Sequence, residues 1–207
     1  MTKIKICGLT RKEDIAFANE LRPDYIGFVF AEKSRRAVTP AQAKGLKTAL
    51  SPSVRAVGVF VDENPDTVCE LARERVIDMI QLHGNETAAY IKCLKAAVEV
   101  PVIQAFRVQT PADIAAANAS LADYVLLDSG AGGGQVFDWP LTGGMERPFF
   151  LAGGLSPRNV REAIEACRPF AVDLSSGVET DGKKDYDKIK ALIEAVRDGN
   201  CKEMEHR

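Results

Sequence analysis

Three side chains that can exchange protons or bind anions stand at or just after the ends of apolar segments. Cys7 closes KIKIC and precedes a glycine, Asp128 ends DYVLLD, and Arg36 follows DYIGFVF after a polar stretch. A thiol near cationic groups can ionise and accept a proton, and a carboxyl at an apolar rim can have a raised pKa and donate one. An arginine fork matches a carboxylate or phosphate. The alternatives are a small buried thiol, a turn cap and a solvated charge.

Two segments, LAGGLS (151–156) and DLSSGVE (173–179), carry an apolar run into small residues. Consecutive backbone N–H groups without Cβ obstruction can surround a phosphate. The candidate phosphate-binding residues are Gly153, Gly154, Ser176 and Gly177. Because backbone donors make this cradle, Lys183 and Lys184 are expected to matter little. The alternative is two tight turns that require positive φ.

His83 in IQLHG and Asp173 in FAVDLS are possible rim residues. The alternative for His83 is a hydrogen bond to a loop carbonyl. Asp173 lies within a strand, so its side chain points inward or joins a structural ion pair. The glycine-rich segment 128–139 has the composition of a loop that orders over a ligand, with a plain flexible linker as the alternative.

Eight short apolar runs, too short for helices, alternate along most of the chain with helical patterns. The predicted strands are 3–7, 24–30, 54–61, 77–82, 101–106, 123–128, 148–153 and 170–175. The predicted helices are 11–21, a helix from Pro65 capped by Asn64, 86–98, 111–119, 157–167 capped by Ser156, and 186–199 ending at Gly199.

This alternation predicts an α/β protein with a parallel sheet, either a closed (β/α)8 (TIM) barrel or an open doubly wound sheet. Eight evenly spaced strands favour the barrel, as one domain over 1–199 with short loops and a polar C-terminal tail over 200–207. In such a barrel the carboxyl ends of the strands meet at one mouth, and the loops after strands 7 and 8 commonly bind phosphate. The candidate residues would therefore share one site.

Composition excludes several classes of function. The chain has 207 residues, 46% hydrophobic and 27% charged, with a net charge of −2, so bulk charge recruits neither nucleic acid nor a membrane surface. No apolar run reaches the ~18 residues of a membrane span, and a secretory signal is not expected. Five cysteines without a CxxC pair indicate no metal site or disulfide framework and favour a reducing cytoplasm. A monomer or weak homodimer is expected.

One acid, one base and two anion-binding groups together predict isomerisation of a phosphorylated small molecule. The motifs KICGLT, SRR, AVGVFVDE, IQLHGNE, FDW, LAGGLSPRNV and DLSSGVE appear in order across 3–185. Together they closely resemble the phosphoribosylanthranilate isomerases of tryptophan biosynthesis. That family usually reads GGTG or GGSG before FDW, whereas this chain has Ala131 to Gly134, so position 133 lacks a hydroxyl.

The resemblance implies a (β/α)8 barrel that needs no cofactor or metal and catalyses an Amadori rearrangement. It implies that Asp128 is the general acid that opens the furanose ring. It further implies that Cys7 is the general base that removes the C2′ proton. Arg36 would hold the anthranilate carboxylate, and the two glycine loops would hold the phosphate.

Two other functions compete with this one. The related sugar-phosphate isomerase of histidine synthesis uses a pair of aspartates, one at the end of strand 1, where this chain has Cys7. A phosphate-binding barrel without catalysis predicts loss of the acid or the base, yet both residues are present.

Overall fold

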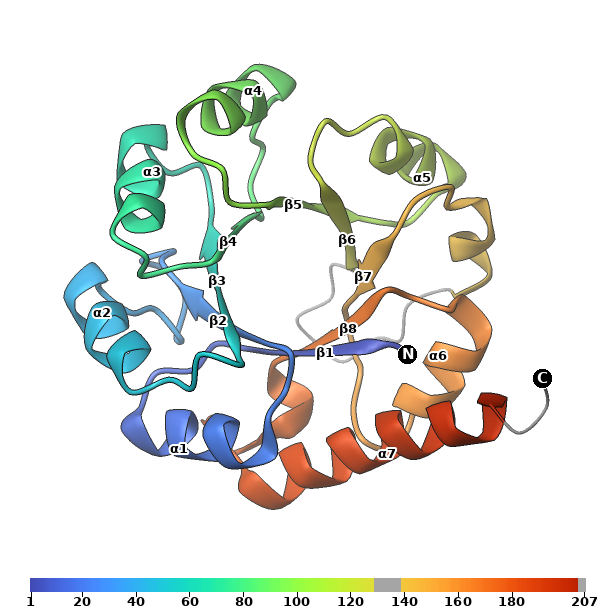
Figure 1. The fold of residues 1–207 in the computed structure, drawn as a ribbon. Coiled ribbons are helices and arrows are strands. Elements are labelled where there is room, and N and C mark those ends of the chain that lie inside the picture. The colour runs from blue at the N-terminus through green and yellow to red at the C-terminus, as the bar shows by residue number, and fades with distance from the viewer. Residues whose placement is uncertain (129–138, 205–207) are drawn as a thin grey trace.

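The computed structural model describes residues 1–128 and 139–204, with side chains described up to residue 198. Eight parallel strands close into a barrel in chain order, with β8 paired back to β1 (Figure 1). The strands are β1 Lys3–Cys7, β2 Tyr25–Val29, β3 Arg55–Phe60, β4 Met79–Leu82, β5 Val102–Arg107, β6 Tyr124–Asp128, β7 Phe149–Leu151 and β8 Ala171–Leu174. The predicted (β/α)8 barrel is confirmed, and the open sheet is excluded.

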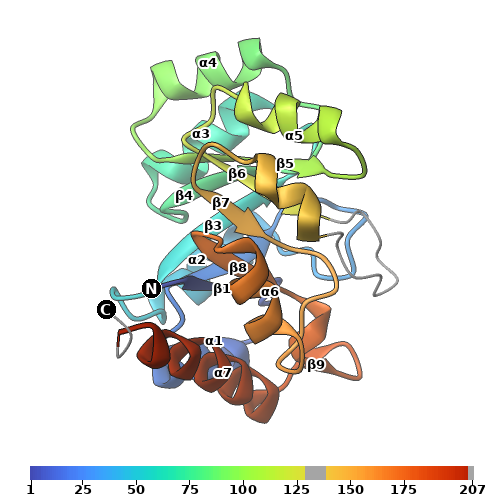
Figure 2. The same cartoon turned by 90° about the vertical axis from the view of Figure 1, so that its right-hand side faces the viewer.

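Helices surround the barrel, and α1 and α7 lie side by side where Phe17 meets Tyr186 edge to face (Figure 2). The helices are α1 Lys12–Leu21, α2 Pro40–Thr48, α3 Pro65–Arg73, α4 Ala88–Ala97, α5 Pro111–Asn118, α6 Val160–Cys167 and α7 Tyr186–Met204. Asn64 caps α3 as predicted, because its side chain accepts a hydrogen bond from the N–H of Asp66.

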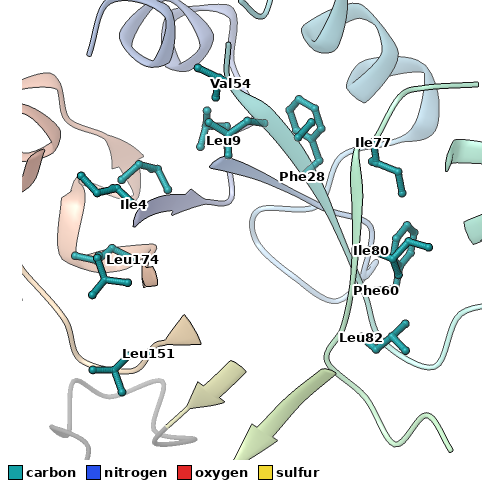
Figure 3. Close-up of a cluster of buried hydrophobic side chains, with 14 of the residues drawn as sticks. Ile4, Leu9, Phe28, Val54, Phe60, Ile77, Ile80, Leu82, Leu151 and Leu174 are labelled. Carbon is teal, nitrogen blue, oxygen red and sulfur yellow. The ribbon is translucent and has the colours of Figure 1, made fainter. Parts of the chain in front are cut away.

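Side chains alternate between two apolar cores along each strand, because successive residues of a strand point to opposite faces. One cluster fills the barrel interior and contains Tyr25, Val57, Met79, Ile103, Leu126, Phe150, Ala152 and Ala171. A larger cluster joins the outer face of the strands to the helices, and Figure 3 shows part of it, including Phe28 and Leu151. Lys5 and Asp173 are buried polar residues that pair in register on β1 and β8.

Two predicted helix boundaries are wrong. Helix α6 begins at Val160 with Asn159 as its N-cap, because the Asn159 side chain accepts hydrogen bonds from the N–H and hydroxyl of Ser156 and holds that residue in a preceding turn. Helix α7 continues past Gly199 to Met204, through most of the expected polar tail. A single glycine within a long helical pattern is destabilising by only about 1 kcal/mol and does not have to end the helix.

Other elements were absent from the sequence prediction. They are the helix α2, the short 3-10 helices η1 Trp139–Gly144 and η2 Ser176–Val178, and the hairpin of β9 Glu179–Thr180 and β10 Lys183–Lys184. Most of the glycine-rich segment, 129–138 with Gly133, lies outside the described residues. Within the described part of the chain, no helix is long and apolar enough to cross a membrane.

Candidate active site

Cys7 ends β1 and sits in a niche that a glycine of the next strand leaves open. Gly27 of β2 pairs in register with Cys7, and a Cβ built at Gly27 would lie 2.7 Å from the Cys7 Sγ. Real Cβ atoms do not approach a neighbour so closely, so any larger residue at Gly27 would displace the thiol. The strand glycine in GFVF therefore reserves space for the candidate base.

Arg36 crosses above Gly8, which has a φ of 80° and whose added Cβ would overlap the arginine side chain. The guanidinium is held by Glu179, with 2.6 Å from Nε to Oε1 and 2.8 Å from Nη2 to Oε2. Arg36 is thus a positioned side chain, 20% exposed, and not a solvated charge. Its Nη1 donates no hydrogen bond to any residue within the described ranges.

Glu179 joins three cations from different parts of the chain. Arg35, Arg36 and Lys184 reach its carboxylate at 3.0, 2.6 and 2.6 Å. Burial favours the neutral acid, but the hydrogen bonds from Arg36 and Lys184 outweigh it and lower the pKa of Glu179. Lys184 is buried and also donates to the carbonyl of Ser175, which follows β8. The expectation that Lys184 matters little is therefore corrected, since this lysine ties the hairpin to the end of β8.

Lys5 and Asp173 form a buried ion pair beneath Cys7, with 2.7 Å between Nζ and Oδ2. Burial raises the pKa of the Cys7 thiol, and Asp173 acts in the same direction, whereas Lys5 and Lys184 lower it. The predicted cationic neighbours are present, but burial and Asp173 outweigh them in this unliganded structure. Asp173 thus fulfils both of its predicted alternatives, pointing into the barrel and joining an ion pair.

Asp128 ends β6 on the same inward-facing side of the barrel wall as Leu126. His83, just after β4, places Nε2 3.5 Å from Asp128 Oδ2, and the Asp128 side chain is 26% exposed. The other ring nitrogen, Nδ1, lies 3.0 Å from Nε2 of Gln81, an interior residue of β4. Because an amide nitrogen only donates, this contact assigns the proton to Nε2 and directs it at Asp128. His83 therefore contacts two side chains in place of a loop carbonyl.

The two glycine loops after β7 and β8 touch each other. A Cβ added at Gly177 would overlap the carbonyl oxygen of Leu155, so the loops pack with no room between them. Gly153 and Gly154 have φ values of 88° and 64°, which favour glycine. Among described residues, no acceptor binds the backbone N–H groups of the four candidates, namely Gly153, Gly154, Ser176 and Gly177. Adjoining loops with unpaired donors suit an anion.

Sequence reasoning missed four residues of this site: Lys5, Gln81, Glu179 and Gly27. Lys5 carried a detectable signal, because Lys3, Lys5 and Cys7 alternate with isoleucines in KIKIC and must share one face of the strand. The glycine inside GFVF also stood out against strand propensity. Nothing local connects Glu179 with Arg36, which lies 143 positions earlier in the chain. In the described ranges, no cluster of three or more His, Cys, Asp or Glu residues is placed to hold a metal ion.

A (β/α)8 barrel with titratable side chains and unpaired loop amides at the carboxyl ends of its strands has the layout of a barrel enzyme that acts on a small anionic molecule. The family model described as N-(5'phosphoribosyl)anthranilate (PRA) isomerase matches residues 4–195. The chain therefore belongs to the phosphoribosylanthranilate isomerase family.

Individual relatives agree with this assignment over nearly their whole length. The N-(5'-phosphoribosyl)anthranilate isomerase of Endomicrobium trichonymphae is 43% identical, over 95% of this chain and 99% of its own. A phosphoribosyl anthranilate isomerase solved with reduced 1-(o-carboxyphenylamino)-1-deoxyribulose 5-phosphate superposes with a TM-score of 0.83 at 38% identity, covering 96% and 100% of the two chains. Monomers generated from the dimeric Thermotoga maritima enzyme give 0.83 at 39% identity, with the same coverage.

Proposed function

We propose that this chain catalyses the Amadori rearrangement of N-(5-phosphoribosyl)anthranilate to 1-(2-carboxyphenylamino)-1-deoxyribulose 5-phosphate, a step of tryptophan biosynthesis. The enzyme is an intramolecular oxidoreductase that interconverts an aldose and a ketose. Substrate and product are isomers, so the reaction needs proton transfers but no net oxidant or reductant. Family membership over residues 4–195 supports this assignment.

Asp128 acts as the general acid and protonates the furanose ring oxygen, so that the C1′–O bond breaks and a protonated Schiff base forms. Cys7, as a thiolate, then removes the proton from C2′ and gives an enolamine. Tautomerisation of the enolamine yields the ketone, and proton return restores both residues. Their positions at the ends of β1 and β6, facing the same barrel interior, support an acid and a base on different sides of one ligand.

Arg36 binds the anthranilate carboxylate through its Nη1 edge. Glu179 holds the opposite edge of the guanidinium, and this fixes the direction in which the remaining donors point. Lys184 and Arg36 together carry more positive charge than Glu179 neutralises, so the region keeps a field that favours an anion. His83 holds the Asp128 carboxyl at the mouth in this scheme.

The phosphate binds to the backbone N–H groups of Gly153, Gly154, Ser176 and Gly177. The observation that carries the proposal is that these unpaired amides adjoin the candidate base, because the hydroxyl of Ser175, one residue before the second loop segment, donates 3.0 Å to the carbonyl of Cys7. A phosphate and a reacting sugar carbon can thus be held at one mouth.

The test is loss of phosphoribosylanthranilate fluorescence with the purified chain, with product identified by mass. Turnover is expected in the presence of a chelator and without added cofactor. The matched control is the Cys7→Ala variant, purified identically to exclude a contaminating host isomerase. Equal rates for the two proteins would overturn the proposal. We further propose a cytoplasmic location and a monomer or weak homodimer; the latter is checked by analytical ultracentrifugation.

A further inference from the structure

The buried pair of Lys5 and Asp173 has no part in the scheme above, although it lies directly beneath the candidate base. Lys3, Lys5 and Cys7 occupy alternate positions of β1 and so share the interior face of the barrel. Lys5 is completely buried, and Asp173 is 8% exposed on the neighbouring strand. An ion pair this deep is costly to desolvate and is weak evidence of a purely stabilising role.

The contacts of this pair leave its charges unequally matched. Lys5 Nζ binds Asp173 Oδ2 and also lies within hydrogen-bond reach of the Cys7 thiol. Asp173 Oδ1 is buried and finds no hydrogen-bond partner among the described residues. The ammonium therefore has two acidic neighbours, whereas the carboxylate has one cation and one uncompensated oxygen.

We propose that Lys5 and Asp173 are positioning residues that set the charge state of Cys7, with the Lys5 ammonium holding the thiolate and Asp173 opposing it. This inference rests on the proposed function, in which Cys7 must lose its proton before it can act as a base. That proton leaves to solvent, because Lys5 already carries its full three. Burial alone lowers the pKa of Lys5, but the charges of Asp173 and Cys7 outweigh it, and the pKa of Lys5 is raised.

The other charged groups that face Cys7 are already engaged elsewhere. Lys184 comes from β10 and Arg36 from the segment after β2, and both sit in close ion pairs with Glu179. Their fields at the thiol are partly cancelled by that carboxylate. Gly27, which faces the sulfur from β2, brings no charge. Lys5 is thus the cation best placed to respond when Cys7 ionises.

The sign of the effect separates this role from a structural one. Removing the positive charge in Lys5→Met should favour the neutral thiol, whereas removing the negative charge in Asp173→Asn should favour the thiolate. A neighbouring charge typically shifts a titration by about 1–3 pH units, and we expect at least about one unit in each direction. Loss of packing alone would not move the two variants in opposite directions.

The experiment measures the rate of Cys7 alkylation by iodoacetamide against pH, with the Cys7 peptide quantified by mass spectrometry. Lys3→Met is the matched control, because it removes a lysine from the same face of β1. Lys3 contacts the rings of Tyr25 and Phe170 at the opposite end of the barrel, each at 5.5 Å. Its midpoint should equal that of the unsubstituted protein.

If Lys5→Met does not fold, Lys5→Met combined with Asp173→Asn removes the pair without leaving a buried lone charge. Its midpoint should lie above that of Asp173→Asn alone. In the folded single variant, the acid limb of kcat/KM should move upward with the alkylation midpoint, costing about tenfold in kcat/KM per unit on that limb. Unchanged midpoints, or shifts of both single variants in the same direction, would overturn the inference.

The titration is measured without substrate, so its failure is distinct from failure of the proposed function. Unmoved midpoints in an active isomerase would remove only the role of Lys5 and Asp173. An inactive protein whose midpoints move in opposite directions would instead remove the isomerase and leave the electrostatic control of Cys7 standing.

Discussion

At the scale of single residues, the candidate chemistry depends on space that two glycines leave open. Gly27 makes room for the Cys7 sulfur, and Gly8 makes room for the Arg36 stem. The chemically active residues could be predicted from their types and their places at strand ends. Their immediate partners could not, because Glu179 and Lys5 act through contacts that only the closed barrel creates.

Cys7 and Asp128 should behave as separate essential groups. Cys7→Ala and Asp128→Ala are each expected to reduce kcat at least ~10²-fold, within the usual range for the loss of an acid or base. Cys7→Ser should also be poor, because a hydroxyl of similar size is far harder to ionise than a thiol. Steady-state kinetics, with circular dichroism to verify folding, checks this. Near-normal turnover in either alanine variant would remove that residue from the mechanism.

Arg36 should contribute to binding more than to proton transfer. Arg36→Met keeps much of the side-chain volume and removes the fork, so KM should rise with a smaller change in kcat. The neighbouring Arg35→Met is the matched control. Arg35 reaches the same Glu179 but is 62% exposed, and exposed ion pairs contribute little. Equal effects of the two substitutions on KM would contradict a specific carboxylate contact for Arg36.

At the scale of elements, the site is assembled by short segments that carry little pattern of their own. The hairpin β9–β10 delivers Glu179 and Lys184 to the mouth, yet each of its strands is only two residues long. The turn before α6 is held by Asn159, whose amide group donates to the carbonyl of Gly154. Such segments are set by tertiary contacts, so sequence patterns predicted the long elements well and these connections poorly.

The contact between the two phosphate loops gives a test at this scale. Gly177→Ala should push the loops apart, because the new methyl group would overlap the carbonyl of Leu155, and KM for the phosphorylated substrate should rise. Inorganic phosphate should also compete less well. Gly45→Ala is the matched control: Gly45 lies in α2 with open space around it, and alanine should stabilise that helix slightly.

Both variants are compared by inhibition with phosphate and by thermal denaturation. We expect weaker phosphate inhibition only in Gly177→Ala, and no loss of melting temperature in Gly45→Ala. Unchanged phosphate inhibition in a folded Gly177→Ala protein would place the anion somewhere other than between these loops.

At the scale of the whole molecule, the barrel follows from a repeated strand–helix alternation, which is why the fold class could be predicted from sequence. Closure brings β1 beside β8, and with them Lys5 beside Asp173, 168 positions apart in the chain. The same closure places the ends of all eight strands at one mouth. The gathering of candidate residues was thus predictable, whereas the ion pairs that link them depend on side-chain packing across strands and loops.

The central claim is that one mouth holds the phosphate on the two glycine loops with Cys7 and Asp128 at the reacting carbons. The most direct measurement is a crystal structure with the reduced product analogue. We predict the phosphate on the N–H groups of Gly154 and Gly177, the carboxylate at Arg36 Nη1, and the ligand's C2′ within reach of the Cys7 sulfur. A phosphate bound elsewhere, or a C2′ facing away from both Cys7 and Asp128, would contradict the account.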